Sequence, residues 1–273
     1  DVLFAKILGY KIIAIVHEYH IALPGNYFKK TNSYIFDKTF GYFSTATLPI
    51  SKFLEDKNKH YNKPQLLLPI LYDFSKDNKK GKRNESNNEY FLFCGHARYA
   101  RLILIIVQGF KQLNFESYNI QLKLILHGTP EDIKRVELDI INLGINNRVT
   151  IESKLPFSVL NKRYNEALAL LVPLDPKNLQ DKARFSQKTA EYLSSKRPVI
   201  TVSVGEITAY FKDKENALVC ESLNSEQIAE KMNWILNNRT QADEIGQKGY
   251  ITGKKHFDYR KKGEQLHCFL KTL

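Results

Sequence analysis

The feature that most constrains this chain is a series of short, continuously apolar runs separated by helix-like segments. The runs lie at residues 90–94, 122–126, 149–151, 168–172, 198–202 and 217–220. A strand buried on both faces of a sheet is apolar at nearly every position, whereas a half-exposed strand alternates. Strands that alternate with helices in this way predict an α/β domain with a doubly wound parallel sheet.

Helix boundary signals support the same prediction. Thr129, followed by Pro130 and an acidic residue, is typical of a helix start, and Gly144 is typical of a helix end. A further helix is expected over about residues 101–113. We expect the later helices to be capped by the serines that precede them, namely Ser158, Ser186 and Ser225.

The segment SKDNKKGKRNESNN at residues 75–88 is polar throughout and predicts a linker. Upstream, residues 12–16 and 65–69 predict strands, and residues 42–48 predict a strand that leads into a helix capped by Ser51. Two or three strands are too few for a full domain, and the chain begins without Met in a helix-like pattern. We therefore expect it to be an N-terminally truncated fragment of a longer protein.

Composition narrows the possible partners. The formal net charge of +12 suits phosphorylated ligands, an anionic membrane surface or nucleic acid, but no nucleic-acid motif is found, so no nucleic-acid partner is expected. The 3 cysteines lie far apart and predict reduced thiols inside the cell. His17 and His20 are three residues apart, whereas a zinc-protease helix needs a spacing of four, so no metal site is expected.

A doubly wound sheet binds its ligand at the carboxyl ends of its strands. Neither G-x-x-x-x-G-K-[ST] nor G-x-G-x-x-G occurs, so the ligand must be held differently. The helix start near Ser186 offers free N–H groups for an anion, reinforced by Arg184 and Lys188. Glu191, one turn into that helix, can accept hydrogen bonds from the two hydroxyls of a ribose.

Residues 183–202 read ARFSQKTAEYLSSKRPVITV and are followed by SVGE. This stretch resembles the donor-binding signature of the retaining glycosyltransferases of family four, in the variant R-F-P-x-K-x-x-E-Y-L-A-x-G-K-P-V-I. The similarity extends over nearly the whole chain. FLFCG at 91–95 is similar to the family's strand and glycine, KENALV at 214–219 to its D-G-E-N-G-L-L-V segment, and the strand before His17 to its strand that ends in His-Asp or His-Glu.

The resemblance implies the GT-B fold, in which two Rossmann-like domains face each other, with the first incomplete here. Residues 1–74 would be part of the acceptor-side domain, 75–88 the linker, 89–245 the donor domain, and 246–273 a C-terminal helix that crosses back to the first domain. It also implies transfer of a sugar from a UDP- or GDP-sugar to a hydroxyl of a glycan or lipid-linked acceptor. Transfer would proceed with retention and without metal or cofactor, in cell-surface polysaccharide or glycolipid synthesis.

The resemblance implies roles for particular residues. His17, Arg101 and Lys188 would act in catalysis, and the donor would contact Gly95, His96, Arg184, Phe185, Ser186 and Glu191. Three positions depart from the family: Ala183 replaces the first acid of its Glu, seven residues, Glu motif, His96 replaces its diphosphate arginine, and Arg101 replaces its lysine. Arg101 keeps the charge, but His96 is only partly charged at neutral pH.

Two alternatives remain open at this point. One is a nucleotide-sugar epimerase of the same architecture. The other is a catalytically silent nucleotide-binding scaffold, which the residues at positions 96 and 183 would suit. The expected location is cytoplasmic, with peripheral binding at the inner membrane face left open.

Overall fold

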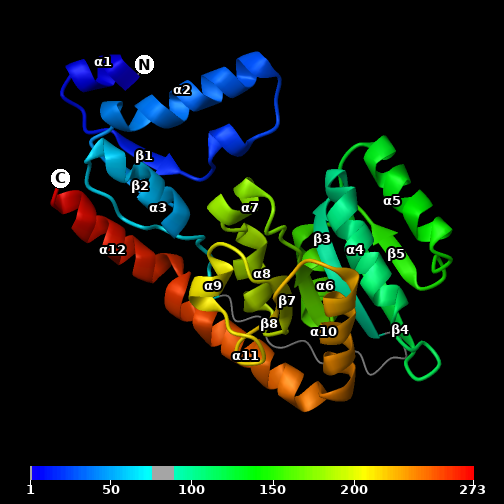
Figure 1. Cartoon of the computed structure of the whole chain (residues 1–273). Helices are drawn as coiled ribbons and strands as arrows, with labels where there is room; N and C mark the ends of the chain where they lie inside the picture. The colour runs from blue at the N-terminus through cyan, green and yellow to red at the C-terminus, as the bar shows by residue number, and fades with distance from the viewer. Residues whose placement is uncertain (1, 76–88) are drawn as a thin grey trace.

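The computed structural model describes residues 2–75 and 89–273, which form two α/β units on either side of a cavity (Figure 1). The first unit has a two-stranded parallel sheet, in which Ile13 of β1 pairs with Ala46 of β2. Its elements are α1 (Val2–Ile7), β1 (Ile13–Val16), η1 (His20–Ala22), α2 (Tyr27–Phe43), β2 (Ala46–Pro49), α3 (Lys52–Asn58) and η2 (Lys59–Tyr61).

Helix α2 was missed by the sequence analysis, and the strand predicted at 42–48 was wrong at its start. The Asn26 side chain accepts a hydrogen bond from the Lys29 N–H and so caps α2, and Phe36 stacks on Phe40 one turn later with ring centroids 5.3 Å apart. Residues 42 and 43 are aromatic, which favours strands locally, but here they complete the helix.

The segment predicted as a strand at 65–69 is not assigned as a strand, although Gln65 forms a parallel bridge with Thr47. The Leu66 N–H donates to Thr47 O at 3.1 Å, and the Leu68 N–H donates to Pro49 O at 2.9 Å. The segment therefore follows the edge of β2 without forming a regular strand, and it leads the chain toward the cavity.

The second unit contains a six-stranded sheet with the order β5-β4-β3-β6-β7-β8, in which every pair is parallel. Its strands are β3 (Glu89–His96), β4 (Ile120–His127), β5 (Val149–Glu152), β6 (Ala169–Val172), β7 (Val199–Val202) and β8 (Leu218–Cys220). The central strands β3, β6 and β7 are buried almost throughout, as their continuous apolar sequences predicted. The predicted doubly wound sheet is confirmed.

Helices cover both faces of this sheet. On one face, helix α4 packs against α5 and α10. On the other face, α8 packs against α11, and the Tyr164 ring of α6 contacts the Tyr192 ring of α8. The helices of this unit are η3 (Ala97–Tyr99), α4 (Ala100–Lys111), α5 (Pro130–Asn142), α6 (Phe157–Glu166), α7 (Leu179–Ala183), α8 (Gln187–Ser194), α9 (Ile207–Tyr210), α10 (Ser225–Asn237) and α11 (Arg239–His256).

The helix caps only partly follow the predictions. The Thr129 side chain caps α5 and Gly144 follows its end with a φ of 70°, both as predicted. The predicted cap Ser158 was wrong, because α6 already begins at Phe157. Ser225 is the first residue of α10, and the Asn224 side chain supplies the cap instead by accepting from the Gln227 N–H. Asn is as good a cap as Ser, so the predicted cap of α10 was wrong by one residue.

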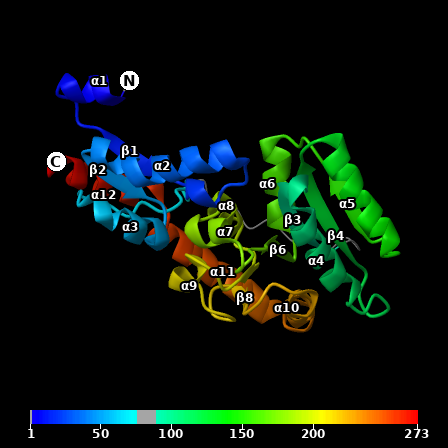
Figure 2. The ribbon, with the colours of Figure 1, turned by 45° about the horizontal axis from the view of Figure 1, so that its top comes forward.

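The chain returns to the first unit at its C-terminal end. Helix α11 ends before Phe257, and α12 (Tyr259–Lys271) then lies beside β2 and α3 in both ribbon views (Figures 1 and 2). At the break, the Tyr72 N–H donates to Phe257 O at 2.9 Å and the Tyr259 N–H donates to Tyr72 O at 3.2 Å. The segment after 246 is therefore two helices instead of one.

The predicted linker at 75–88 lies outside the described residues, except for Ser75. Within the two described ranges, no helix is both long and apolar enough to cross a bilayer.

Candidate functional site

A cavity of about 770 Å³ lies between the two units. It is lined by residues that follow β1, by the carboxyl ends of β3 and β6, and by the beginning of α8. From β3 the sheet runs to β4 and β5 on one side, and from β6 it runs to β7 and β8 on the other. The cavity therefore opens at the point where the strand order reverses, which is where doubly wound sheets bind ligands.

The structure brings nearly all of the predicted site residues to this cavity. Those that line it are His17, Gly95, His96, Arg184, Phe185, Ser186, Lys188 and Glu191. They come from both units and from segments up to 174 positions apart in the sequence (191 − 17). The expectation that a doubly wound sheet binds its ligand at the carboxyl ends of its strands and the family resemblance therefore both point to this cavity.

Arg101 is the exception, because it is not among the residues that line the cavity. Its guanidinium forms an ion pair with Asp175, and its side chain is 64% exposed. Helix α4 begins at Ala100, after a short turn (η3) that carries Arg98 and Tyr99, and these two residues line the cavity instead. The cation that faces the cavity from this loop is therefore Arg98.

The beginning of α8 presents groups of the kind that bind an anion. Ser186 occupies the N-cap position, but its side chain makes no capping hydrogen bond, so the first N–H groups of the helix are not satisfied by it. Lys188 Nζ lies 3.9 Å from Glu191 Oε2 and 3.4 Å from Cys94 Sγ. The positive end of the helix and the Lys188 ammonium therefore reinforce each other at the cavity wall.

Phe185 lies between this surface and the core. Its ring stacks on Tyr210, with centroids 5.6 Å apart and an interplanar angle of 4°, and meets the edge of Phe257 at 5.2 Å. The side chain is 5% exposed. Phe185 therefore mainly fixes the loop between α7 and α8 against α9 and the end of α11.

Two imidazoles lie next to each other at the ends of β3 and β4. His96 and His127 have ring centroids 4.9 Å apart, and the His96 Nδ1 accepts a hydrogen bond of 3.1 Å from the Arg98 N–H. Burial lowers the pKa of His127, and the neighbouring His96, Lys188 and Arg98 lower it further. Burial and these positive neighbours therefore favour the neutral form of His127.

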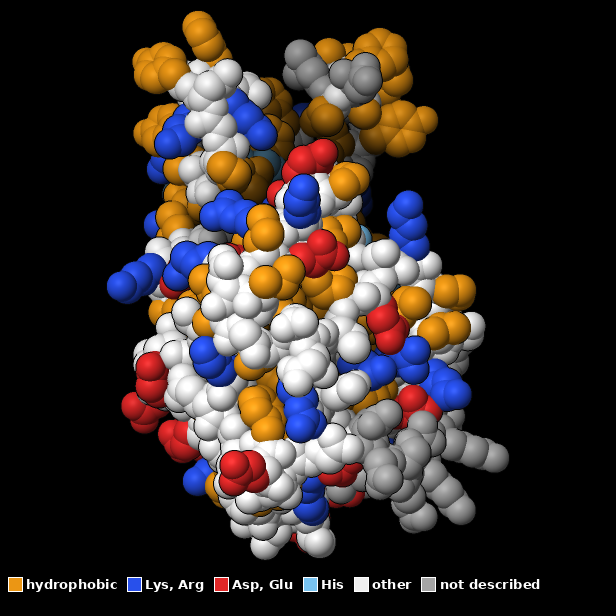
Figure 3. Space-filling model, turned by 90° about the vertical axis from the view of Figure 1, so that its right-hand side faces the viewer, with side chains coloured by type: hydrophobic (Ala, Val, Ile, Leu, Met, Phe, Trp, Pro, Cys, Tyr) orange, Lys and Arg blue, Asp and Glu red, His pale blue; other side chains and the backbone are white. Residues whose placement is uncertain are grey.

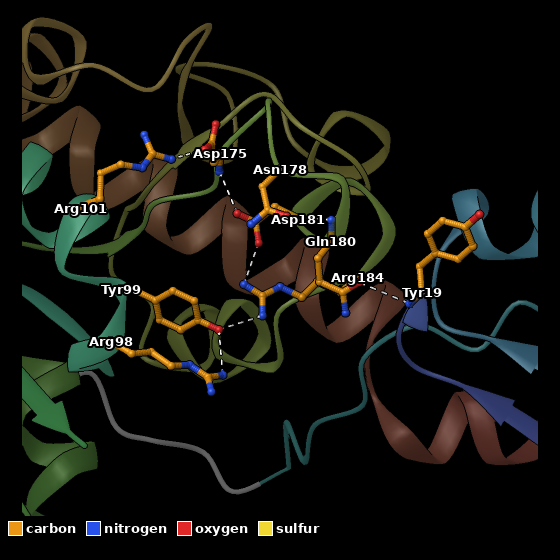
Figure 4. Close-up of polar contacts among 9 residues, drawn as sticks. All are labelled: Tyr19, Arg98, Tyr99, Arg101, Asp175, Asn178, Gln180, Asp181 and Arg184. Carbon is orange, nitrogen blue, oxygen red and sulfur yellow. Dashed lines mark hydrogen bonds and ion pairs between the residues drawn. The ribbon is translucent and has the colours of Figure 1, made fainter. Parts of the chain in front are cut away.

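A chain of polar contacts joins the loop after β3 to the loop after β6 (Figure 4). Arg184 donates to Tyr99 Oη at 3.4 Å and to Asp181 Oδ1 at 2.7 Å, and Arg98 donates to the same Tyr99 oxygen at 3.1 Å. Asp181 also accepts from the Asp175 N–H at 2.9 Å. Burial raises the pKa of Tyr99, but the hydrogen bonds from the two arginines outweigh it and lower the pKa overall.

Contacts between the units hold α7 in place beside the cavity. The Ser51 hydroxyl donates to Ala183 O, and the Tyr19 N–H donates to Gln180 Oε1 at 3.3 Å. On its other side α7 meets Gly205, which has a φ of 53° and whose Cβ, if present, would lie 2.8 Å from Lys182 O. Only glycine fits this close backbone approach at a left-handed φ.

Glu206 makes a further contact between the units. Its Oε1 accepts a hydrogen bond of 2.6 Å from the Lys52 N–H at the start of α3, and the residue is 4% exposed. Burial raises the pKa of the Glu206 carboxyl. The carboxylate therefore ties the loop after β7 to the first unit at the cost of being desolvated.

The sequence analysis gave no individual role to several residues of the cavity wall, among them Glu18, Arg98, Tyr99 and His127. His127 directly follows the predicted strand at 122–126, where a doubly wound sheet is expected to bind its ligand. Arg98 and Tyr99 lie in a short turn that has no periodic signal. Among the described residues, no group of three or more His, Cys, Asp or Glu side chains could hold a metal ion.

Solved structures share this architecture. HepE of Anabaena, in complex with UDP and glucose, has a TM-score of 0.78 at 12% identity, covering 100% of this chain and 74% of that chain. Sucrose-phosphate synthase of Thermosynechococcus elongatus has a TM-score of 0.79 at 15% identity, covering 99% and 71%. A TarM mutant of S. aureus has a TM-score of 0.71 at 13% identity, covering 97% and 53%. At these identities the likeness establishes the fold, which is GT-B.

A comparison with curated proteins found no match. The model of the family "Glycosyl transferases group 1" matches residues 74–252, which is more than half of the 273 residues. The match includes the whole six-stranded sheet and every cavity residue that the second unit contributes. The chain therefore belongs to the glycosyl transferases group 1 family.

Proposed function

We propose that the chain transfers a sugar from a nucleoside diphosphate sugar to a hydroxyl of a glycan or lipid-linked acceptor, with retention at the anomeric carbon. The observation that carries the proposal is the cavity between the units, where the start of α8, Lys188 and Glu191 lie together. HepE was solved with UDP and with UDP-glucose, which favours UDP over GDP as the nucleotide here. Residues 89–245 would form the donor domain.

The diphosphate is the leaving group, and its negative charge grows as the bond to the sugar breaks. The N–H groups at the start of α8 and the Lys188 ammonium lie where they can stabilise that charge electrostatically. No metal ion is needed in this proposal, because the positive groups come from the protein. Arg101 does not line the cavity, so Lys188 would be the cation that acts on the diphosphate.

The ribose would be held by Glu191, whose carboxylate is 24% exposed and lines the cavity. His17 faces the cavity from the first unit, so it would contact the transferred sugar where the acceptor enters. Glu18, next to it, lines the same wall. Gly95, His96 and Phe185 would shape the floor between these groups.

A location at the inner face of the cytoplasmic membrane suits this activity, because lipid-linked acceptors of cell-surface polysaccharide or glycolipid synthesis lie there. Helix α2 supports it: Tyr27 is 80% and Phe28 is 82% exposed, and Lys29 and Lys30 follow them. Hydrophobic side chains project, together with Lys and Arg, at the end of the molecule where α1 and α2 lie (Figure 3). Exposed aromatics beside lysines favour an anionic lipid surface.

A silent nucleotide-binding scaffold is the second candidate, and Ala183 is the observation that favours it. The side chain is fully buried and can make no polar contact with a sugar. Such a scaffold would bind UDP but would neither hydrolyse nor transfer the sugar of a donor.

The test is to titrate UDP and uridine into the wild-type chain and into Lys188→Gln. The proposal expects wild type to bind UDP more tightly than uridine, and Lys188→Gln to lose that difference, because only UDP carries the diphosphate. Release of UDP from a donor in the presence of an acceptor extract would then separate the transferase from the scaffold. Equal binding of UDP and uridine by wild type would refute the diphosphate site.

A further inference from the structure

The cavity holds two cationic side chains besides the lysine of the proposed nucleotide site. Three cationic side chains line it, Arg98, Arg184 and Lys188, against two carboxylates, Glu18 and Glu191. Glu191 lies 3.9 Å from Lys188, and that pair belongs to the proposed nucleotide site at α8. The other two cations of the cavity are the arginines.

The two arginines are joined through one phenol. Tyr99 Oη accepts hydrogen bonds from both guanidinium groups, and its ring lies under them, with its centroid 5.1 Å from Arg98 Cζ and 5.7 Å from Arg184 Cζ. Asp181 fixes Arg184 from the other side at 2.7 Å. The guanidinium groups are therefore held in place before a ligand arrives, which lowers the entropy that binding would cost.

Neither arginine has used all of its donors. Arg98 is exposed and makes no ion pair within residues 2–75 and 89–273. Arg184 Nε is buried without a hydrogen-bond partner among the same residues. A guanidinium presents several N–H donors in one plane, a geometry that matches a carboxylate.

The position of Arg184 points to the transferred sugar. It directly follows Ala183, whose carbonyl accepts the hydrogen bond from Ser51 of the first unit, so it lies where the two units meet. A group that passes from a donor in one unit to an acceptor in the other must pass through that place. Ala183 contributes no carboxylate there that would repel an acidic sugar.

We infer that Arg184 and Arg98, bridged by Tyr99, bind a carboxylate on the transferred sugar, so that the donor is a nucleotide-linked acidic sugar. This inference rests on the proposed function, because it assumes that the nucleotide is held at α8. The rival role for the two arginines is to bind the diphosphate itself.

Three ligands separate these roles: UDP, UDP-glucose and UDP-glucuronate, of which the last two differ only by a hydroxymethyl or carboxylate group on the sugar. Wild type should bind UDP-glucuronate about tenfold more tightly than UDP-glucose, since a charge-assisted, bidentate contact is gained. Arg184→Gln and Arg98→Gln should each reduce this preference to less than about threefold, while UDP affinity changes little. Lys177→Gln, in the exposed loop before α7 and outside the cavity lining, is the matched control and should keep the preference.

Equal binding of the two sugars by wild type would overturn the inference and leave the proposed function intact. A loss of UDP affinity in Arg184→Gln as large as the loss for UDP-glucuronate would assign the arginines to the diphosphate and also overturn it. Failure of wild type to bind UDP at all would instead refute the proposed function. Arg98→Gln protects the test against misfolding, because Arg98 is exposed and its loss disturbs no buried group.

Discussion

Replacing Glu191 with Gln should weaken nucleotide binding without unfolding the protein. Within the described residues the carboxylate forms an ion pair with Lys188 at 3.9 Å, and a partly exposed pair at that distance adds little stability. If it accepts two hydrogen bonds from the ribose hydroxyls, the substitution removes their charge assistance and leaves one acceptor. We expect a loss of about 1–3 kcal/mol, which corresponds to an affinity lower by about 5- to 150-fold.

Calorimetric titration of UDP and of uridine measures this effect. Both ligands carry the ribose, so both should lose affinity by a similar factor. Glu137→Gln is the control, since Glu137 is exposed on α5 and does not line the cavity. Unchanged affinity for both ligands would refute the ribose assignment. A loss for UDP alone would mean that Glu191 acts through Lys188 and the diphosphate.

The remaining predictions concern the stability effects of substitutions at Gly246, Gly263 and Glu206. Gly246→Ala should lower the free energy of unfolding by about 1–3 kcal/mol, since its Cβ would meet backbone atom Lys196 O at 2.5 Å. Gly263→Ala, with nothing within 4 Å, should raise it by about 0.5–1 kcal/mol in the same urea experiment; equal effects would contradict the packing argument. Because the folded pKa of Glu206 is raised above 4.5, its contribution to stability is fully present below pH 4.5 and is lost as pH rises through the folded pKa. Glu206→Gln keeps an acceptor for the Lys52 N–H and should reduce that loss; an unchanged pH profile of unfolding would refute this.

The second unit could be predicted from the sequence because its signals are local and agree with one another. Continuous apolar runs identified each strand of the large sheet, and the residues after them, such as His96, fell at the cavity. The proposed anion site at α8 rests on a serine, a lysine and an acid at helical spacing, and the structure brings all three to the cavity. Each of these features depends on a short stretch of chain, so the local sequence pattern is enough to predict it.

Helix α2 of the first unit and the detailed contacts could not be predicted in the same way. Helix α2 is rich in aromatic residues, which favour strands locally, so the sequence pattern does not indicate a helix. In the folded chain Phe40 of this helix packs on Tyr61, with ring centroids 5.1 Å apart. Arg101 occupies the expected sequence position, but its orientation depends on Asp175, which is 74 positions away. The bridge from Arg184 through Tyr99 to Arg98 likewise joins two loops that only the folded chain brings together.

The most direct test of the central claim, that the cavity between the units holds the nucleotide of the donor, is a crystal structure of this chain with UDP. We expect the ribose hydroxyls within hydrogen-bond distance of the Glu191 carboxylate and the diphosphate at the first turn of α8, beside Lys188. UDP bound outside this cavity, or inside it with the ribose away from Glu191 and the phosphates away from α8, would contradict the account.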